Sequence, residues 1–364
     1  MKRLSIQNIL VPIDFSKLSS QAVETAKQVA FRFEARLHLV HINEANYPAG
    51  FMAPTPGLSG DVVSIQHANE KELQRRLVDF AVRLSFSPSD CHVISDAPNF
   101  DAICRFAQRV AADLIVMPTH GHTGLKHVFL GSTAERVVQH ASCPVLIARQ
   151  RDSGFNKILV PVDFSGSSMK ALNYAISFAG RVGAKIILLH AVRPGYAYVG
   201  DARTVYDLAA FNESLRVETE RQMREFIHAA KFGGVKFETA VRLGAAVEEI
   251  CDFARSEDVD LIITATHGRT GFKHVLIGSV AERVVRHADR PVLVVPSHPK
   301  LRLATLKRCA HPTGIICRVR RHTPAMKPNP AHLPGHIHLG SKGVPYENNP
   351  SNRTREIDRH APTV

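Results

Sequence analysis

Residues 119–148 read THGHTGLKHVFLGSTAERVVQHASCPVLIA, and their pattern of glycines and apolar residues is the most informative part of the sequence. It follows the apolar run Leu114–Met117, which predicts a short buried strand. Its glycines permit sharp bends, and the segment after them has the apolar spacing of a helix, with Ser132 or Thr133 as a natural N-cap. The run Pro144–Ile147 predicts a further strand. A glycine-rich loop that leads from a strand into a helix N-terminus favours phosphate, because free N–H groups point out of that terminus.

The stretch occurs twice. Residues 265–295 repeat it with most aligned positions identical, and the opening segment Asn8–Ser16 returns as Lys157–Ser165, each time with Pro-x-Asp-Phe-Ser. Such self-similarity exceeds what shared helix propensity produces. The chain is therefore a duplication.

At these residues the sequence resembles the universal stress protein (UspA) family in its tandem two-domain form. In that family each domain opens with a strand ending in Pro-x-Asp and closes with Gly-x-x-Gly, nine residues, Gly-Ser/Thr, a helix and a Pro-Val-Leu strand. The resemblance covers about residues 4–297 and predicts domain one at 1–149, a linker at 150–155, domain two at 156–297 and a tail at 298–364. It implies two doubly wound α/β domains with parallel strands in the order 3-2-1-4-5, and a ligand beyond the carboxyl ends of strands one and four.

The apolar pattern agrees with this fold class, because strands that alternate with helices imply right-handed crossovers and helices on both faces of a parallel sheet. The expected strands are 8–13, 37–42, 91–94, 114–117 and 144–147 in the first copy, and 158–162, 186–190, 235–240, 261–265 and 291–295 in the second. In the family the last strand of each domain lies at an edge through which domains pair. We therefore expect the two copies to form a pseudo-dimer within one chain, with a further homodimer as an option.

Composition limits the class of protein. Six scattered cysteines without a CxxC pair predict a reduced, cytoplasmic protein. No run approaches the ~20 apolar residues of a membrane span, so no membrane partner is expected. The tail from His298 carries 12 Lys and Arg against 3 Asp and Glu, which is nine of the +13 net charges, together with nine prolines and seven histidines. We expect it to be disordered and to bind nucleic acid weakly at most.

The resemblance implies an adenine nucleotide as ligand, ATP with Mg²⁺, and assigns its contacts residue by residue. In domain one they are Pro12, Asp14, Ile42, Gly121, Gly131, Ser132 and Thr133; in domain two they are Pro161, Asp163, Ala191, Ala265, Gly268, Gly278, Ser279 and Val280. The residues alone leave alternatives open. The aspartates also suit helix caps, and the glycines also suit a tight loop without a ligand.

The two copies depart from the family motif at its first glycine, where Pro118 stands in domain one and Ala265 in domain two. Proline has no N–H to donate and carries a ring, whereas alanine keeps the N–H and adds only a methyl group. We therefore expect domain two to be the better nucleotide site.

No catalytic or metal-ligating residue is predicted. GxxxxGK[ST] and nucleophile signatures are absent, and the recurring His41, His190, His120 and His267 have no acid–base partner at a fixed spacing, which favours loop or packing roles. The expected function is a stress-response regulator that binds nucleotide. The alternatives are a scaffold that works through protein partners without nucleotide, and a slow ATPase or autophosphorylating protein with Ser132 or Ser279 as acceptor.

Overall fold

The computed structural model describes residues 4–44, 59–86, 90–96, 98–119, 130–149, 154–193, 208–266 and 278–296. All of them belong to one compact unit, Met1–Lys300. The tail predicted to be disordered lies outside the described residues, as do Gly121 and Gly268 of the glycine-rich loops. We call residues 4–149 the first half and residues 154–296 the second half.

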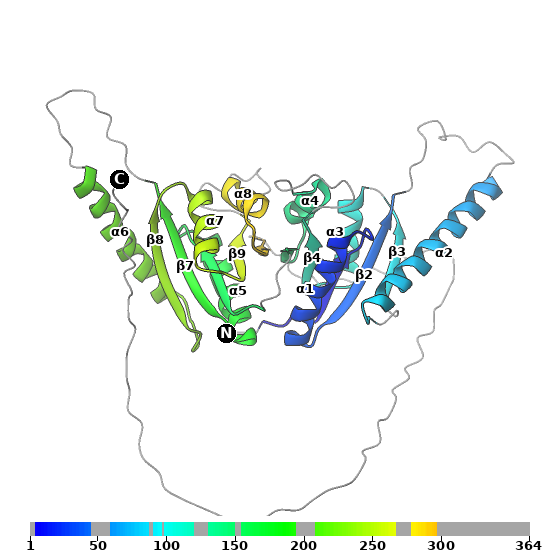
Figure 1. The fold of residues 1–364 in the computed structure, drawn as a ribbon, viewed down its shortest axis with the longest axis horizontal. Helices are drawn as coiled ribbons and strands as arrows, with labels where there is room; N and C mark the ends of the chain where they lie inside the picture. Colours follow the sequence, from blue (N-terminus) through cyan, green and yellow to red (C-terminus); the bar gives the residue numbers. More distant parts are fainter. Residues whose placement is uncertain are drawn as a thin grey trace, which may run out of the picture. The chain divides into compact units, whose positions relative to one another are not determined.

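Each half repeats the same alternation of strands and helices (Figure 1). The first half contains β1 (Asn8–Pro12), α1 (Lys17–Phe33), β2 (Arg36–Asn43), α2 (Ser59–Arg83), β3 (Cys91–Ser95), α3 (Asn99–Arg109), β4 (Leu114–Pro118), α4 (Ser132–His140) and β5 (Val145–Ala148). The second half contains β6 (Lys157–Pro161), α5 (Gly166–Val182), β7 (Lys185–Val192), α6 (Leu208–Ala229), β8 (Phe237–Leu243), α7 (Ala246–Ser256), β9 (Leu261–Ala265), α8 (Ser279–His287) and β10 (Val292–Val295).

The strands lie in the order β3-β2-β1-β4-β5-β10-β9-β6-β7-β8. Within each half the pairing is parallel and the order is 3-2-1-4-5, so the predicted fold class is confirmed. The last strands of the two halves, β5 and β10, pair antiparallel with Leu146 opposite Leu293. This pairing covers two apolar strand edges that would otherwise be exposed.

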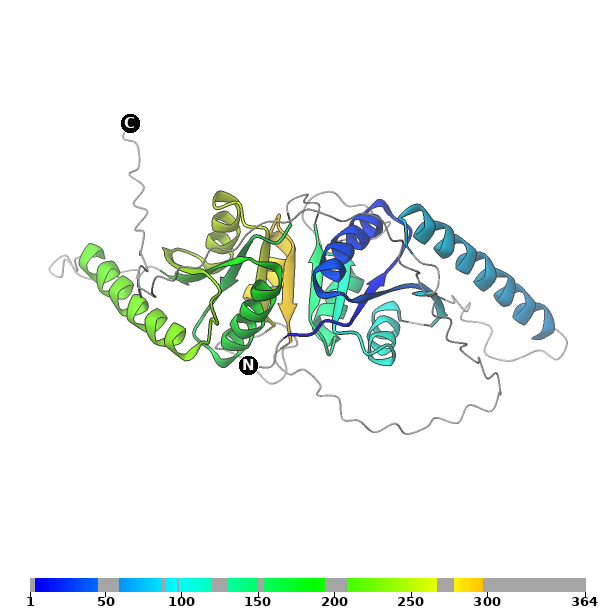
Figure 2. The ribbon, with the colours of Figure 1, turned by 90° about the horizontal axis from the view of Figure 1, so that it is seen from below.

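Alternate residues of the buried strands enter two separate apolar layers. In β1, Ile9 and Val11 face the layer formed with α1 and α2, while Leu10 faces the layer formed with α3 and α4. The second half has α5 and α6 on one face and α7 and α8 on the other. Helices therefore cover both faces of each parallel sheet (Figure 2), and both faces of the central strands are apolar for this reason.

Polar contacts join the halves beside the β5–β10 pair. Arg149 Nη2 donates to Val285 O in the last turn of α8 at 2.6 Å, and Arg286 lies 3.5 Å from Glu135 of α4. Arg181 of α5 donates to Arg32 O at the end of α1 at 2.8 Å. The two halves therefore share side-chain contacts as well as a strand pair.

The predicted N-cap of α4 is wrong by one residue. The cap is Gly131, with φ −63° and ψ 143°, and neither Ser132 nor Thr133 caps the helix. The Gly131 N–H donates to Thr119 O at 2.8 Å, which fixes the glycine just outside the helix and makes Ser132 its first residue. Gly278 does the same for α8 by donating to Thr266 O at 2.6 Å.

Candidate functional site

The turn after β1 is built around Asp14. Its Oδ1 accepts the Ser16 N–H at 3.0 Å and the Ser19 hydroxyl, while the Asp14 N–H donates to Ser19 Oγ at 3.1 Å. Ser16 is the N-cap of α1, and its hydroxyl accepts the Ser19 N–H at 3.2 Å. The alternative in which Asp14 itself caps the helix is therefore wrong, because the carboxylate binds the N–H of the cap residue.

The turn also depends on Phe15, which the sequence analysis did not single out. Phe15 has a φ of 64°, a left-handed conformation that is rare for a bulky residue. Its ring lies 4.6 Å from the ring of His41, whose Nδ1 is 2.7 Å from Ile13 O. Because a carbonyl only accepts, this Nδ1 carries the proton. His41 thus has the packing role predicted for it, and it clamps the turn from the end of β2.

The second half repeats the main contacts of this turn, although the Ser168 hydroxyl, at the position of Ser19, donates to Ser165 O at 3.0 Å. Asp163 Oδ1 accepts the Ser165 N–H at 3.0 Å, and Ser165 is the N-cap of α5. Phe164 has a φ of 63° and lies 4.4 Å from the ring of His190, whose Nδ1 is 2.6 Å from Val162 O. In the sequence, this contact between phenylalanine and histidine is indicated only by the recurrence of both residues in the two copies.

Strand pairing brings the predicted site residues to one edge of the sheet. In the first half β1 lies between β2 and β4, so Pro12 and Asp14 at its carboxyl end lie between Ile42 on β2 and the chain that leaves β4. That chain is joined to Gly131 by the bond from Gly131 N–H to Thr119 O. The described residues of the first-half site, which also include Ser132 and Thr133, therefore converge, and Gly121 lies outside the described residues.

The second half has the same convergence. β6 lies between β7 and β9, which places Pro161 and Asp163 between Ala191 on β7 and Ala265 at the end of β9. Gly278, Ser279 and Val280 follow at the start of α8, and Ser279 and Val280 are exposed. Gly268 lies outside the described residues.

The N-termini of α4 and α8 can accept an anion. Neither Gly131 nor Gly278 provides a side-chain cap, so the N–H groups of the first helical turn have no capping oxygen from these residues. Such a terminus has three donors and a partial positive charge, and both favour phosphate. The glycine N–H itself is already used by Thr119 or Thr266, so the donors are those of the residues that follow.

The departures from the motif occupy different environments in the two halves. Ala265 ends β9 with 7% of its surface exposed, so its methyl group is almost entirely buried. Pro118 ends β4 and is partly exposed at the same edge. At the end of strand two, Ile42 and Ala191 are both partly exposed, which leaves part of each side chain accessible.

The described parts of the chain contain no cluster of three or more His, Cys, Asp or Glu that could hold a metal ion. No helix in those parts combines the length and apolar character needed to cross a membrane. The cysteines Cys91, Cys104, Cys143 and Cys251 are buried thiols that form no disulfide bond within the described residues.

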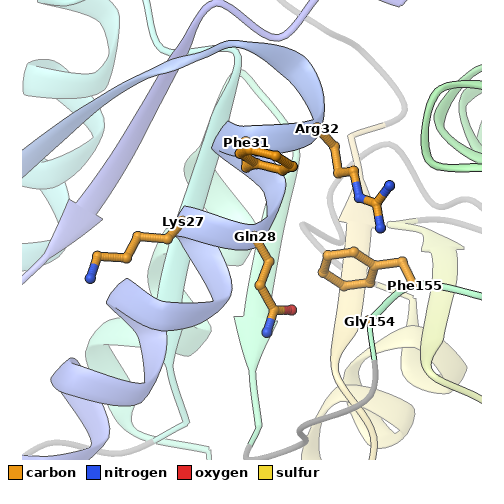
Figure 3. Close-up of a pocket in the computed structure, with 6 residues that line it drawn as sticks. All are labelled: Lys27, Gln28, Phe31, Arg32, Gly154 and Phe155. Atoms are coloured by element: carbon orange, nitrogen blue, oxygen red, sulfur yellow. The ribbon is translucent and has the colours of Figure 1, made fainter.

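A shallow pocket of about 330 Å³ lies elsewhere (Figure 3). It is lined by the last turns of α1, with Lys27, Gln28, Phe31 and Arg32, and by Gly154 and Phe155 just before β6. In a parallel α/β unit these segments lie at the amino ends of the strands, because the helix returns antiparallel to them. The pocket is therefore separate from the site at the carboxyl ends.

Comparisons with known proteins agree with this architecture. The model of the universal stress protein family matches the chain twice, over residues 5–149 and 154–296. Universal stress protein MJ0531 of Methanocaldococcus jannaschii is 34% identical over 155 residues, which is 42% of this chain and 89% of that protein. A universal stress protein of Mycolicibacterium smegmatis is 26% identical over 301 residues, covering 79% of this chain and 96% of its own length.

Among solved structures, a universal stress protein from Archaeoglobus fulgidus has a TM-score of 0.51 and 17% identity, covering 80% of this chain and 97% of that chain. At this identity the likeness shows the fold alone. It extends across both halves.

Proposed function

Since this chain belongs to the universal stress protein family, we propose that it binds an adenine nucleotide, as ATP with Mg²⁺, and acts as a stress-responsive regulator. The observation that carries the proposal is the convergence, in each half, of an aspartate turn and an uncapped helix N-terminus at one sheet edge. A nucleotide needs both an anion site for its phosphates and a polar group near its ribose, and this edge offers both.

The second half is proposed as the better site. The first-turn N–H groups of α8 would bind the phosphates, Asp163 would lie toward the ribose or Mg²⁺, and the end of β7 at Ala191 would lie near the adenine. Ala265 keeps an N–H where Pro118 has none, and a hydrogen bond to a charged group contributes ~1.5–3 kcal/mol. Against this, Ile42 offers more apolar surface than Ala191, at ~0.8 kcal/mol per buried methylene. The missing donor and the ring of Pro118 favour the second half.

Thermal unfolding with Mg-ATP tests the proposal. A ligand that binds only the folded state adds about 2.7 kcal/mol of stability at about 100 times Kd. The melting temperature of the whole chain should therefore rise by several degrees with millimolar Mg-ATP. AMP and ADP are the controls for recognition of the phosphates. No shift with any of the three would contradict nucleotide binding.

A nucleotide-independent scaffold is the second candidate, and Pro118 is the observation that favours it. Mass spectrometry of the protein as purified separates the two, because a bound nucleotide is retained only by a nucleotide-binding chain. We also propose a reducing compartment such as the cytoplasm, which is supported by four buried thiols that form no disulfide bond in the described part of the chain.

A further inference from the structure

Two histidines of the first half lie together beneath α3. His38 is on β2 and His92 is on the neighbouring β3, and their ring centroids are 5.9 Å apart. We call them the histidine pair. The ring of His92 lies 5.0 Å from Phe106 of α3, and His38 has 7% of its surface exposed. The pair therefore forms part of the contact between α3 and the edge of the sheet.

The surroundings of both histidines disfavour the charged form of the ring. His38 Nδ1 and His92 Nε2 are buried and have no hydrogen-bond partner among the described residues. The other nitrogen of His38, Nε2, lies 3.3 Å from Asn8 Oδ1 on β1. Because an amide oxygen accepts hydrogen bonds, Nε2 carries the proton of neutral His38. Nδ1 is then the unprotonated nitrogen of the ring, which can only accept a hydrogen bond. Protonation of His38 would place a new N–H at Nδ1, and the charged form of His92 would hold an N–H at Nε2. Neither N–H has an acceptor among the described residues, which costs free energy.

The charged groups around the pair give little compensation. Asp90, just before β3, accepts from Arg36 Nε of β2 at 2.8 Å and is therefore already paired. From α3, Arg109 lies over the Phe106 ring at 4.5 Å. Two arginines thus face the pair with a single carboxylate. Burial is the main cause that lowers the pKa of both histidines. Asp90 opposes this lowering of the pKa, whereas the charge of Arg36 adds to it for both rings. For His92, the charges of His38 and Arg109 lower the pKa further.

In the second half, the two equivalent positions are occupied by residues that do not titrate. His38 is opposite Leu10 in the register of β1 and β2, and its counterpart opposite Leu159 is Ile187. His92 is opposite Val40, and its counterpart opposite Leu189 is Ala240. The equivalent contact under α7 is therefore insensitive to protonation of these positions.

We propose that the histidine pair is an acid-sensitive contact that holds β3 and α3 in place when neutral and loosens them when protonated. β3 is the terminal strand of the sheet and is paired with β2, so it can separate without disturbing the central strands. A histidine that is held neutral in the fold contributes stability above its ordinary pKa of about 6.5, and this stability is lost as the pH falls below that value. The inference is independent of nucleotide binding.

Hydrogen–deuterium exchange of the full chain between pH 7.5 and pH 5, corrected for intrinsic exchange rates, tests the proposal. The amides of β3 and α3 should lose protection below about pH 6, by about tenfold per unit of lowered pKa, while those of β8 and α7 should not. His38→Ile with His92→Ala copies the second half and should abolish this dependence. Equal pH dependence in the variant and the original chain, or in both halves, would overturn the proposal.

A volume-matched variant, His38→Gln with His92→Gln, serves if the first variant does not fold. Histidine ring resonances in the NMR spectrum of the unaltered chain give an independent measure. Both resonances should titrate below pH 6.5. Titration of either at or above pH 6.5 would overturn the proposal.

Discussion

The two halves agree most closely at the turn that follows their first strand. Phe15 and Phe164 have φ values of 64° and 63°, and each aspartate binds the N–H of the serine that caps the next helix. The halves differ beside this turn, where Pro118 ends β4 and Ala265 ends β9, and also within the strands beneath α3, where the histidine pair replaces Ile187 and Ala240. The turn geometry therefore needs only a few residues, and other positions can diverge without changing it.

The largest effect is expected where the halves meet. Leu146 and Leu293 are fully buried and opposite each other in the β5–β10 pair. Leu146→Ala and Leu293→Ala should each lower the free energy of unfolding by about 3 kcal/mol, since a buried leucine leaves a cavity. Chemical denaturation measures the loss. Val82→Ala, at an exposed position, is the control and should change stability by less than about 0.5 kcal/mol. A loss below about 1 kcal/mol from either substitution would show that the β5–β10 pair contributes little to the free energy of unfolding.

The aspartate of the turn should contribute to stability in both halves. Asp14→Ala and Asp163→Ala each leave the N–H of the cap serine without its carboxylate acceptor. We expect a loss of about 2 kcal/mol for each, as for hydrogen bonds to charged groups. Asp14→Asn keeps an acceptor oxygen and should lose less. If Asp163→Ala were neutral while Asp14→Ala was not, the two turns would not be equivalent.

Removing the cap itself should have a smaller effect. Ser16→Ala and Ser165→Ala delete hydroxyls that accept helix N–H groups at 3.2 and 3.1 Å. Each should cost about 1 kcal/mol, measured as the shift in the denaturation midpoint. Gly substitutions at the same positions should cost less than Ala, because glycine is tolerated at an N-cap. Unequal costs in the two halves would count against the matched geometry.

The smallest effect on stability is expected at a position of α5 whose hydroxyl has no hydrogen-bond partner in the described part of the chain, in contrast to the equivalent hydroxyl of α1. The Tyr174 hydroxyl is buried with no hydrogen-bond partner among the described residues, whereas Thr25 at the matching position donates to Gln21 O at 3.1 Å. Tyr174→Phe should therefore leave stability unchanged or raise it by up to about 1 kcal/mol, because an unsatisfied polar group is removed. Thermal unfolding checks this. A loss of more than about 1 kcal/mol would reveal a partner for the hydroxyl.

The sequence predicted the fold well because the signals were long and repeated. Buried strands such as β1 and β9 follow from unbroken apolar runs, and the strand order follows from the family resemblance. β8 was expected at 235–240 but extends over Phe237–Leu243. This edge strand is half exposed, so its bounds depend on pairing with β7 and not on an apolar pattern.

Details of the site were harder to predict. The left-handed φ of Phe15 and Phe164 depends on contacts with a histidine that is 26 residues further along the chain in each half. The N-cap of α4 shifted to Gly131 because a backbone bond to Thr119 fixes the helix start. Neither effect has a local signature, and the histidine pair likewise arises only when β2 and β3 become neighbours.

A titration of ATP with Mg²⁺ against Gly278→Val and Gly131→Val tests the unequal sites most directly. Both glycines have negative φ, −71° and −63°, so valine fits the backbone and keeps the N–H bonds to Thr266 and Thr119. We expect the added side chain to obstruct the space beside the helix N-terminus. After confirming that both variants are folded, we expect Gly278→Val to weaken ATP binding at least about tenfold, or about 1.4 kcal/mol, and Gly131→Val to leave it nearly unchanged. Loss of binding from Gly131→Val alone would contradict the proposal that the second half is the better nucleotide site.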